Sequence, residues 1–189
     1  MNRTRELAAF ALALFFATGI CSAQQAGPKT AARAPGLSAE LLQQWNEIGR
    51  KLIAMADDFP EDKYDYRPTP SVRTFAEQLL HTTGDTYLFT NAALGEKDPG
   101  PEAESRERFK TKAEVVAYLK KAFADGAAVI KSKGDKGMRE SVKNFEGGGQ
   151  IELLGLGYSR VEHSAEHYGQ LVLYYRMAGL VPPESRPRK

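Results

Sequence analysis

The three histidines of the chain have the spacing with the most chemical meaning. His163 and His167 stand four residues apart, so on a helix both imidazoles would point to the same side. Such a pair can bind one metal ion, and His81 could complete a set of three nitrogen ligands with one position left open. An ion held by three neutral imidazoles lowers the pKa of a bound water toward about 7. This water could then attack an ester, an amide or another polarised carbonyl.

Hydrophobic periodicity predicts the helices that must position these side chains. Their expected ranges are about 38–57, 74–94, 111–133 and 150–177. In the first, apolar residues recur at alternating steps of four and three, as on one buried stripe: Leu41, Trp45, Ile48, Leu52 and Met55. No segment shows the period-two alternation of a strand, although Val142 and Phe145 are expected to pack a short extended piece against the helices. The chain is therefore predicted to be all-α, a four-helix bundle.

Local signals mark where three of these helices begin. Ser38 is expected to be the N-cap of the first helix. Thr74 with Glu77, and Thr111 with Glu114, have the spacing of capping boxes. These pairs predict the starts of the second and third helices.

On the fourth helix, the paired histidines share a stripe with apolar side chains. His163 and His167 lie in line with Leu156, Leu171 and Tyr174 by their spacings of three, four and seven residues. Both imidazoles should therefore face the bundle interior, where an unpaired polar ring is costly. A metal ion would satisfy both rings at once. The alternative is that His163 and His167 are hydrogen-bonded core residues without a metal and that His81 is unrelated to them.

A second interpretation of the histidine pair is a zinc protease. Residues 163–167 match the H-x-x-E-H pattern, in which the glutamate is the general base. Those enzymes take a third, carboxylate ligand from far downstream, but Glu184 is the sole carboxylate after His167 and lies in a proline-rich tail. We therefore expect Glu166 to face solvent or to contact a metal ligand without binding the ion itself.

Other side chains have the spacing to reach the same site. Glu77 stands one turn before His81 and Asp85 one turn after it, and Tyr174 lies on the stripe of the paired histidines. Each could act as a base or orient a ring, and each could equally be an ordinary helix residue. Gly84 would allow a helix or a ligand to approach closely.

The N-terminus has the layout of a secretory signal peptide. Residues 1–23 combine two arginines, an apolar run over 7–20 and small residues before an expected cleavage after Ala23. The apolar run is shorter than the roughly 20 residues needed to cross a bilayer. Cleavage, export to the periplasm or the exterior, and no stable membrane insertion are therefore expected. Lipid attachment at Cys21 is an alternative that Ile20 disfavours.

Residues 24–36 are predicted to be a flexible spacer, and residues 37–185 the domain. The signal segment carries two arginines and one glutamate, so its removal lowers the formal net charge from +2 to +1. This balance gives no electrostatic reason to expect nucleic acid as a partner. The single cysteine leaves with the signal segment, so the domain must be held together by its core rather than by a disulfide.

Two stretches of the sequence resemble the DinB-like family, also called the damage-inducible or YfiT-like metal-dependent hydrolases. They are HSAEHYGQLVLYYRMAGLVPP over 163–183, and YRP at 66–68 followed by TFAEQLLH over 74–81. The resemblance covers about 41–183. It implies a four-helix bundle that holds a divalent ion with His81, His163 and His167.

The resemblance leaves the metal and the activity open. Imidazole ligands suit zinc, nickel, iron and copper alike, so they do not identify the metal. The candidates are zinc, nickel, iron and manganese. The family implies a hydrolase or a transferase that acts on a small molecule, and a homodimer. The export signal is a departure from many relatives, and it weakens any transfer of activities that use low-molecular-weight thiols. A non-catalytic metal- or ligand-binding bundle related to stress is the alternative function.

Overall fold

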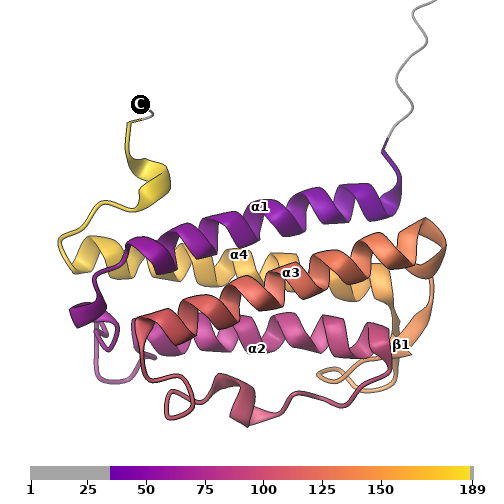
Figure 1. Cartoon of the computed structure of the whole chain (residues 1–189), viewed down its shortest axis with the longest axis horizontal. Helices are drawn as coiled ribbons and strands as arrows, with labels where there is room; N and C mark the ends of the chain where they lie inside the picture. The colour runs from indigo at the N-terminus through magenta and orange to yellow at the C-terminus, as the bar shows by residue number, and fades with distance from the viewer. Residues whose placement is uncertain (1–34, 188–189) are drawn as a thin grey trace, which may run out of the picture. The chain divides into compact units, whose positions relative to one another are not determined.

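Four long helices make up most of the computed structural model, which describes residues 35–187 (Figure 1). They are α1 Leu37–Asp58, α2 Phe75–Leu94, α3 Lys112–Gly137 and α4 Leu153–Met177. Short elements connect or follow them: the 3-10 helices η1 Glu61–Lys63, η2 Pro101–Glu104 and η3 Pro183–Ser185, and the strands β1 Ser141–Lys143 and β2 Gln150–Glu152. The predicted number of helices is confirmed.

The four helices form a bundle in which α1 and α2 are not neighbours. Each of them packs against both α3 and α4. Figure 1 shows that α2 and α3 run in one direction, and that α1 and α4 run in the other. The long connection over 95–111 returns the chain to the end of the bundle where α2 began. As a result, α2 and α4 lie side by side and antiparallel.

The core is rich in aromatic side chains. Trp45 of α1 is almost fully buried, and its ring nitrogen donates to the Phe123 carbonyl of α3 at 2.9 Å. Gly126 makes room for this ring, because a Cβ there would lie 2.1 Å from the Trp45 Cζ2 atom. At the other end, the rings of Phe59 and Phe75 stack with centroids 3.8 Å apart. These contacts fix how the helices cross.

Both predicted capping boxes are confirmed, but the predicted cap of α1 is wrong. Thr74 and Thr111 each accept from the backbone amide three residues on, and the glutamate there bonds back. Gly36 is the N-cap of α1 and forms no side-chain bond. Ser38 lies inside the helix, and its hydroxyl donates to Asp135 at 2.6 Å. Ser38 therefore ties the start of α1 to α3.

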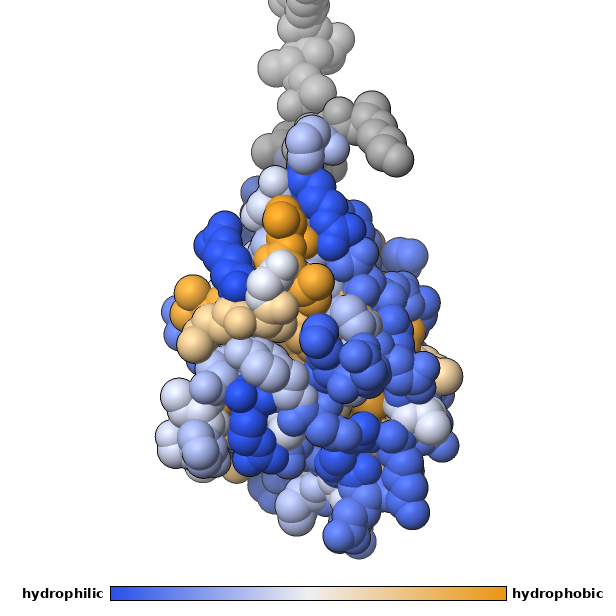
Figure 2. Space-filling view, turned by 90° about the vertical axis from the view of Figure 1, so that its left-hand side faces the viewer, coloured by the Kyte–Doolittle hydropathy of each residue, from blue (hydrophilic) through white to orange (hydrophobic). Residues whose placement is uncertain are grey.

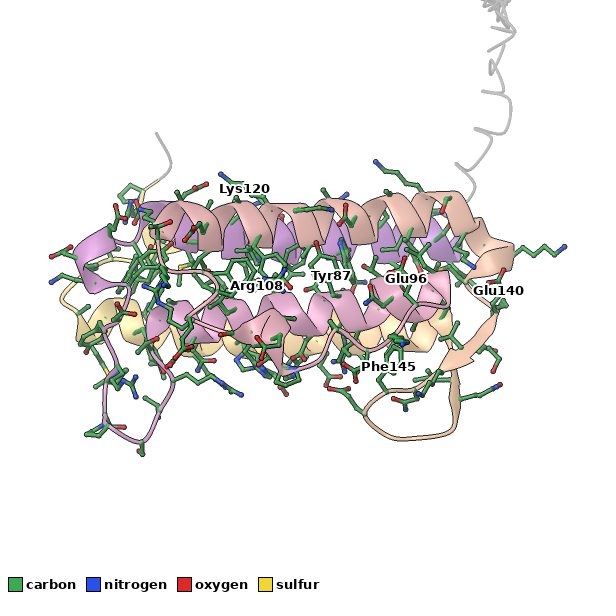
Figure 3. The ribbon with its side chains drawn as sticks, turned by 60° about the horizontal axis from the view of Figure 1, so that its bottom comes forward. Tyr87, Glu96, Arg108, Lys120, Glu140 and Phe145 are labelled. Carbon is green, nitrogen blue, oxygen red and sulfur yellow. The ribbon has the colours of Figure 1, made fainter. Side chains whose placement is uncertain are left out.

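The prediction of no strand is wrong for one short hairpin. β1 and β2 pair antiparallel, with three residues in each, so α4 begins at Leu153 and not at residue 150. Strands this short give no visible alternation. Val142 and Phe145 pack against the core as expected, and Figure 3 shows Phe145 on the hairpin loop beside the helices. At the preceding turn, Gly134 has a φ of 57°, which interrupts regular helix one residue after the expected end of α3.

Within residues 35–187, no helix is long and apolar enough to cross a membrane. Figure 2 shows one end of the bundle, where the surface is mostly hydrophilic and hydrophobic residues are visible in several places. The expected signal peptide over 1–23, and the expected spacer up to residue 34, lie outside the described residues.

Candidate metal centre

The packing of α2 against α4 brings the three histidines together. The Nε2 atom of His163 lies 3.3 Å from that of His81 and 3.0 Å from that of His167. All three residues can place one ligand atom within 4.8 Å of the others. The helical spacing explains the pair on α4, and the antiparallel contact of the two helices supplies His81.

A carboxylate fixes the orientation of His81. Its Nδ1 atom lies 2.8 Å from Oε2 of Glu104. A carboxylate only accepts, so Nδ1 must carry the proton and Nε2 of the neutral ring presents a lone pair to the cluster. The pairing of histidine with a carboxylate on the far ring nitrogen is the usual support for a histidine that binds metal.

Glu104 was not identified from the sequence. It ends η2 in the connection between α2 and α3, 23 residues after His81, where no periodicity relates the two. Gly84 permits the contact, because a Cβ at that position would lie 2.8 Å from the Glu104 Cγ atom. The close approach expected at Gly84 is therefore made by a loop side chain. The glycine was the only sequence signal for it.

Of the other residues considered from the sequence, Asp85 joins the cluster. Only 7% of Asp85 is exposed, and its Oδ2 atom lies 2.6 Å from Nε2 of His163. Glu77 instead accepts from the Thr74 amide, and the Tyr174 hydroxyl donates to the Arg73 carbonyl. Glu166 is 63% exposed by its side chain and lies 3.7 Å from Nδ1 of His163, which agrees with the expected outer position.

Burial and charge give the residues of the cluster different pKa values. Contact with the Asp85 carboxylate raises the pKa of His163, against the effect of burial. Burial lowers the pKa of His167 to about 4, and the neighbouring His163 and His81 add to this shift. Burial alone would raise the pKa of Asp85, but contact with the imidazoles outweighs burial and lowers it. The cluster thus holds a carboxylate beside at least one neutral ring, as a cation site requires.

The surroundings of the cluster are charged on one side. Arg160, one turn before His163, is 5% exposed and pairs with Glu146 of the loop between the strands at 3.0 Å. A cavity of about 370 Å³ lies beside Asp85 and Glu104. Its remaining lining residues are Gly84, Leu88, Asp98, Pro99, Gly100 and Pro101. The cavity is large enough for a small molecule, and its charged lining residues are acidic.

The opposite face of α2 has a different, structural role. Tyr87 stacks on Tyr118 of α3, and its hydroxyl donates to Asp125 at 3.1 Å. Figure 3 shows Tyr87 between these helices. Burial, reinforced by the nearby Asp125 charge, raises the pKa of the Tyr87 phenol. One face of α2 thus packs on α3 while the other presents His81 to α4.

The donor set fits a divalent ion. Two ligands of a tetrahedral ion at 2.0–2.1 Å are about 3.3 Å apart, which matches the spacing of the Nε2 atoms. Among the described residues, Oδ2 of Asp85 is buried without a hydrogen-bond partner and lies 2.6 Å from Nε2 of His163. Nitrogen lone pairs and a carboxylate oxygen that face one another are stable only with a cation or protons between them.

Comparison with known proteins gives a family and a fold. The family model of the DinB superfamily matches residues 44–171. A DinB-like protein from Bacillus cereus is similar in structure, with 17% identity, a TM-score of 0.62, and coverage of 76% of this chain and 93% of that one. A DinB-like protein from Bacillus subtilis has 15% identity, a TM-score of 0.60, and coverage of 79% and 99%. No curated protein matches the chain. At these identities, the structures show the shared fold alone.

Proposed function

The chain belongs to the DinB superfamily, and from this we propose that it binds a divalent metal ion with His81, His163 and His167. The observation that carries the proposal is the convergence of the three Nε2 atoms, 3.0 and 3.3 Å apart. The candidate ions are zinc, nickel and iron, which imidazole suits, and manganese, which carboxylate ligands suit.

The proposed activity is that of a metal-dependent hydrolase or transferase. The ion, when bound, supplies Lewis acidity for a carbonyl or a water. The chain supplies the rest: Glu104 holds His81 with its Nε2 atom toward the centre, and the cavity of about 370 Å³ admits a small molecule beside Asp85.

A non-catalytic metal-binding role is the second candidate, and one observation favours it. The Oδ2 atom of Asp85 lies 2.6 Å from Nε2 of His163 and 3.4 Å from Nε2 of His81, and it could occupy the position that a substrate would need. A tetrahedral site filled by four protein ligands is typical of structural zinc.

The metal content of the purified protein tests the proposal. The full chain would be expressed without a polyhistidine tag and compared with a variant that carries His81→Ala, His163→Ala and His167→Ala. Elemental mass spectrometry should find about one equivalent of metal in the wild type and none in the variant. A wild type that stays empty after reconstitution with each of the four metals would overturn the proposal. The ion found would then direct a screen of ester, amide and thiol-transfer substrates.

Location and assembly complete the proposal. The protein is exported, with residues 1–23 removed after Ala23, and it forms a homodimer. N-terminal sequencing of the protein from the periplasmic fraction tests the first point, since an intact Met1 would contradict cleavage. Light scattering on the purified protein tests the second, and a monomeric mass would contradict it.

A further inference from the structure

Asp85 occupies a position in the histidine cluster that the family resemblance does not assign. It lies on α2 one turn after His81, and only 7% of the residue is exposed. Its Oδ2 atom is 2.6 Å from Nε2 of His163 and 3.4 Å from Nε2 of His81. The carboxylate thus faces the same point as the ring nitrogens.

This oxygen is unsatisfied within the described part of the chain. Oδ2 of Asp85 is buried and forms no hydrogen bond there, and it lies 2.6 Å from Nε2 of His163, which balances its charge only while that ring carries a proton. A buried carboxylate beside neutral imidazoles is unfavourable, because its charge is left uncompensated. A cation at the centre of the cluster would satisfy it directly.

The other carboxylates near the cluster address different atoms. Glu104 contacts Nδ1 of His81, on the side of the ring away from the cluster. Glu166 lies 3.7 Å from Nδ1 of His163, and its side chain is 63% exposed. Asp85 is set apart from both because its oxygen approaches the Nε2 atoms themselves.

Oδ2 of Asp85 lies close to two of the three ring nitrogens. It is 2.6 Å from Nε2 of His163 and 3.4 Å from Nε2 of His81, and the Nε2 atom of His163 is in turn 3.3 Å from that of His81 and 3.0 Å from that of His167. Ligands at about 2.0–2.1 Å are roughly 2.9 Å apart around an octahedral ion and 3.3 Å apart around a tetrahedral one. We propose that Asp85 is a fourth protein ligand, so that the centre is a three-histidine, one-aspartate site. This inference rests on the proposed metal-binding function.

A fourth, anionic ligand changes what the site can do. The carboxylate lowers the formal charge of the centre from that of the free divalent ion, so the centre is a weaker Lewis acid than three histidines alone would make. A zinc ion would have its tetrahedral positions filled, whereas iron, manganese or nickel in six-coordinate geometry would keep two positions open. If the protein is catalytic, the site therefore favours a six-coordinate metal.

Cobalt(II) titration of the full, untagged chain tests the assignment, because cobalt reports its coordination in its visible spectrum. The variants are Asp85→Ala, which removes the ligand, and Asp85→Asn, which leaves a neutral oxygen. Glu166→Ala is the matched control, since it removes a carboxylate near the same histidine. Circular dichroism would verify that each variant is folded.

We expect cobalt affinity to decrease from wild type to Asp85→Asn to Asp85→Ala, with a loss of at least about 100-fold for the alanine variant, since loss of a ligand exceeds the cost of losing an outer partner. The band positions and intensities should change in Asp85→Ala and stay unchanged in Glu166→Ala. An unchanged affinity in Asp85→Ala, or a weaker affinity with an unchanged spectrum, would overturn the assignment while leaving the three-histidine site in place. A wild type that binds no cobalt would overturn both.

Discussion

Glu104 offers the sharpest test of how the loop between α2 and α3 supports the metal centre. Its Oε2 atom lies 2.8 Å from Nδ1 of His81. An ion bound at Nε2 would lie roughly 6 Å from this oxygen, where a unit charge and a divalent ion interact by about 1.4 kcal/mol even at the dielectric constant of water. The dielectric constant of water is appropriate here, because the Glu104 side chain is 34% exposed. This energy corresponds to a tenfold change in affinity.

We therefore expect Glu104→Gln to weaken zinc binding about tenfold, at the lower end of the 10–100-fold range for outer partners of metal ligands. Glutamine keeps the size of the side chain and removes its charge. Glu102→Gln is the matched control, because Glu102 is exposed on the same 3-10 helix. Competition with a fluorescent zinc chelator at neutral pH measures both variants. Equal affinities for Glu104→Gln and Glu102→Gln would refute the reasoning.

The same contact can be disturbed from the side of α2. In Gly84→Ala the new Cβ would lie 2.8 Å from Cγ of Glu104, so the carboxylate must move away from His81. We expect zinc affinity to fall about as far as in Glu104→Gln. The helix itself should gain up to about 1 kcal/mol, because alanine is the better helix former. Weaker zinc binding without lost helix content separates this effect from misfolding, and unchanged zinc binding would contradict it.

Two further predictions concern stability. Gly126→Ala should destabilise the protein by about 1–3 kcal/mol in urea unfolding, because its Cβ would meet the Trp45 ring, whereas Gly169→Ala, with open space around it on α4, should stabilise by about 0.5–1 kcal/mol. Equal effects would contradict the packing argument. The Arg186 guanidinium lowers the pKa of Asp58, so this pair stabilises the fold above the usual carboxyl pKa and the contribution is lost as pH falls through the lowered value. NMR titration of Arg186→Ala should show the pKa of Asp58 rising, and an unmoved pKa would contradict the pairing.

The helices could be predicted from the sequence because their signals are local. The stripe from Leu41 to Met55 and the capping boxes at Thr74 and Thr111 act within a few residues of chain. Two predictions were wrong, and the first was wrong because it depended on a distant partner. Ser38 has the chemistry of an N-cap, yet its hydroxyl bonds to Asp135 on α3. The short hairpin was not predicted, because a strand of three residues is too short to show an alternating hydrophobic pattern.

The candidate site divides in the same way. His163 and His167 are related by helical spacing, and Asp85 stands one turn from His81, so the sequence could place all of these on helix faces. The sequence did not show that Asp85 faces the cluster, whereas Glu77 accepts a hydrogen bond from the Thr74 amide at the start of α2. That choice depends on how α2 is rotated against α4. The position of Glu104 depends on the path of the loop between α2 and α3, and an irregular loop has no sequence periodicity from which its path could be predicted.

Charge balance explains why the carboxylates matter as much as the histidines. Three neutral imidazoles would leave a buried divalent ion with its full charge, which is costly away from water. Glu104 and Asp85 place two negative charges on opposite nitrogens of His81, at 2.8 and 3.4 Å. Together they match the two positive charges of the ion. We infer that loss of either carboxylate weakens the binding of divalent ions because it leaves the centre with an uncompensated positive charge.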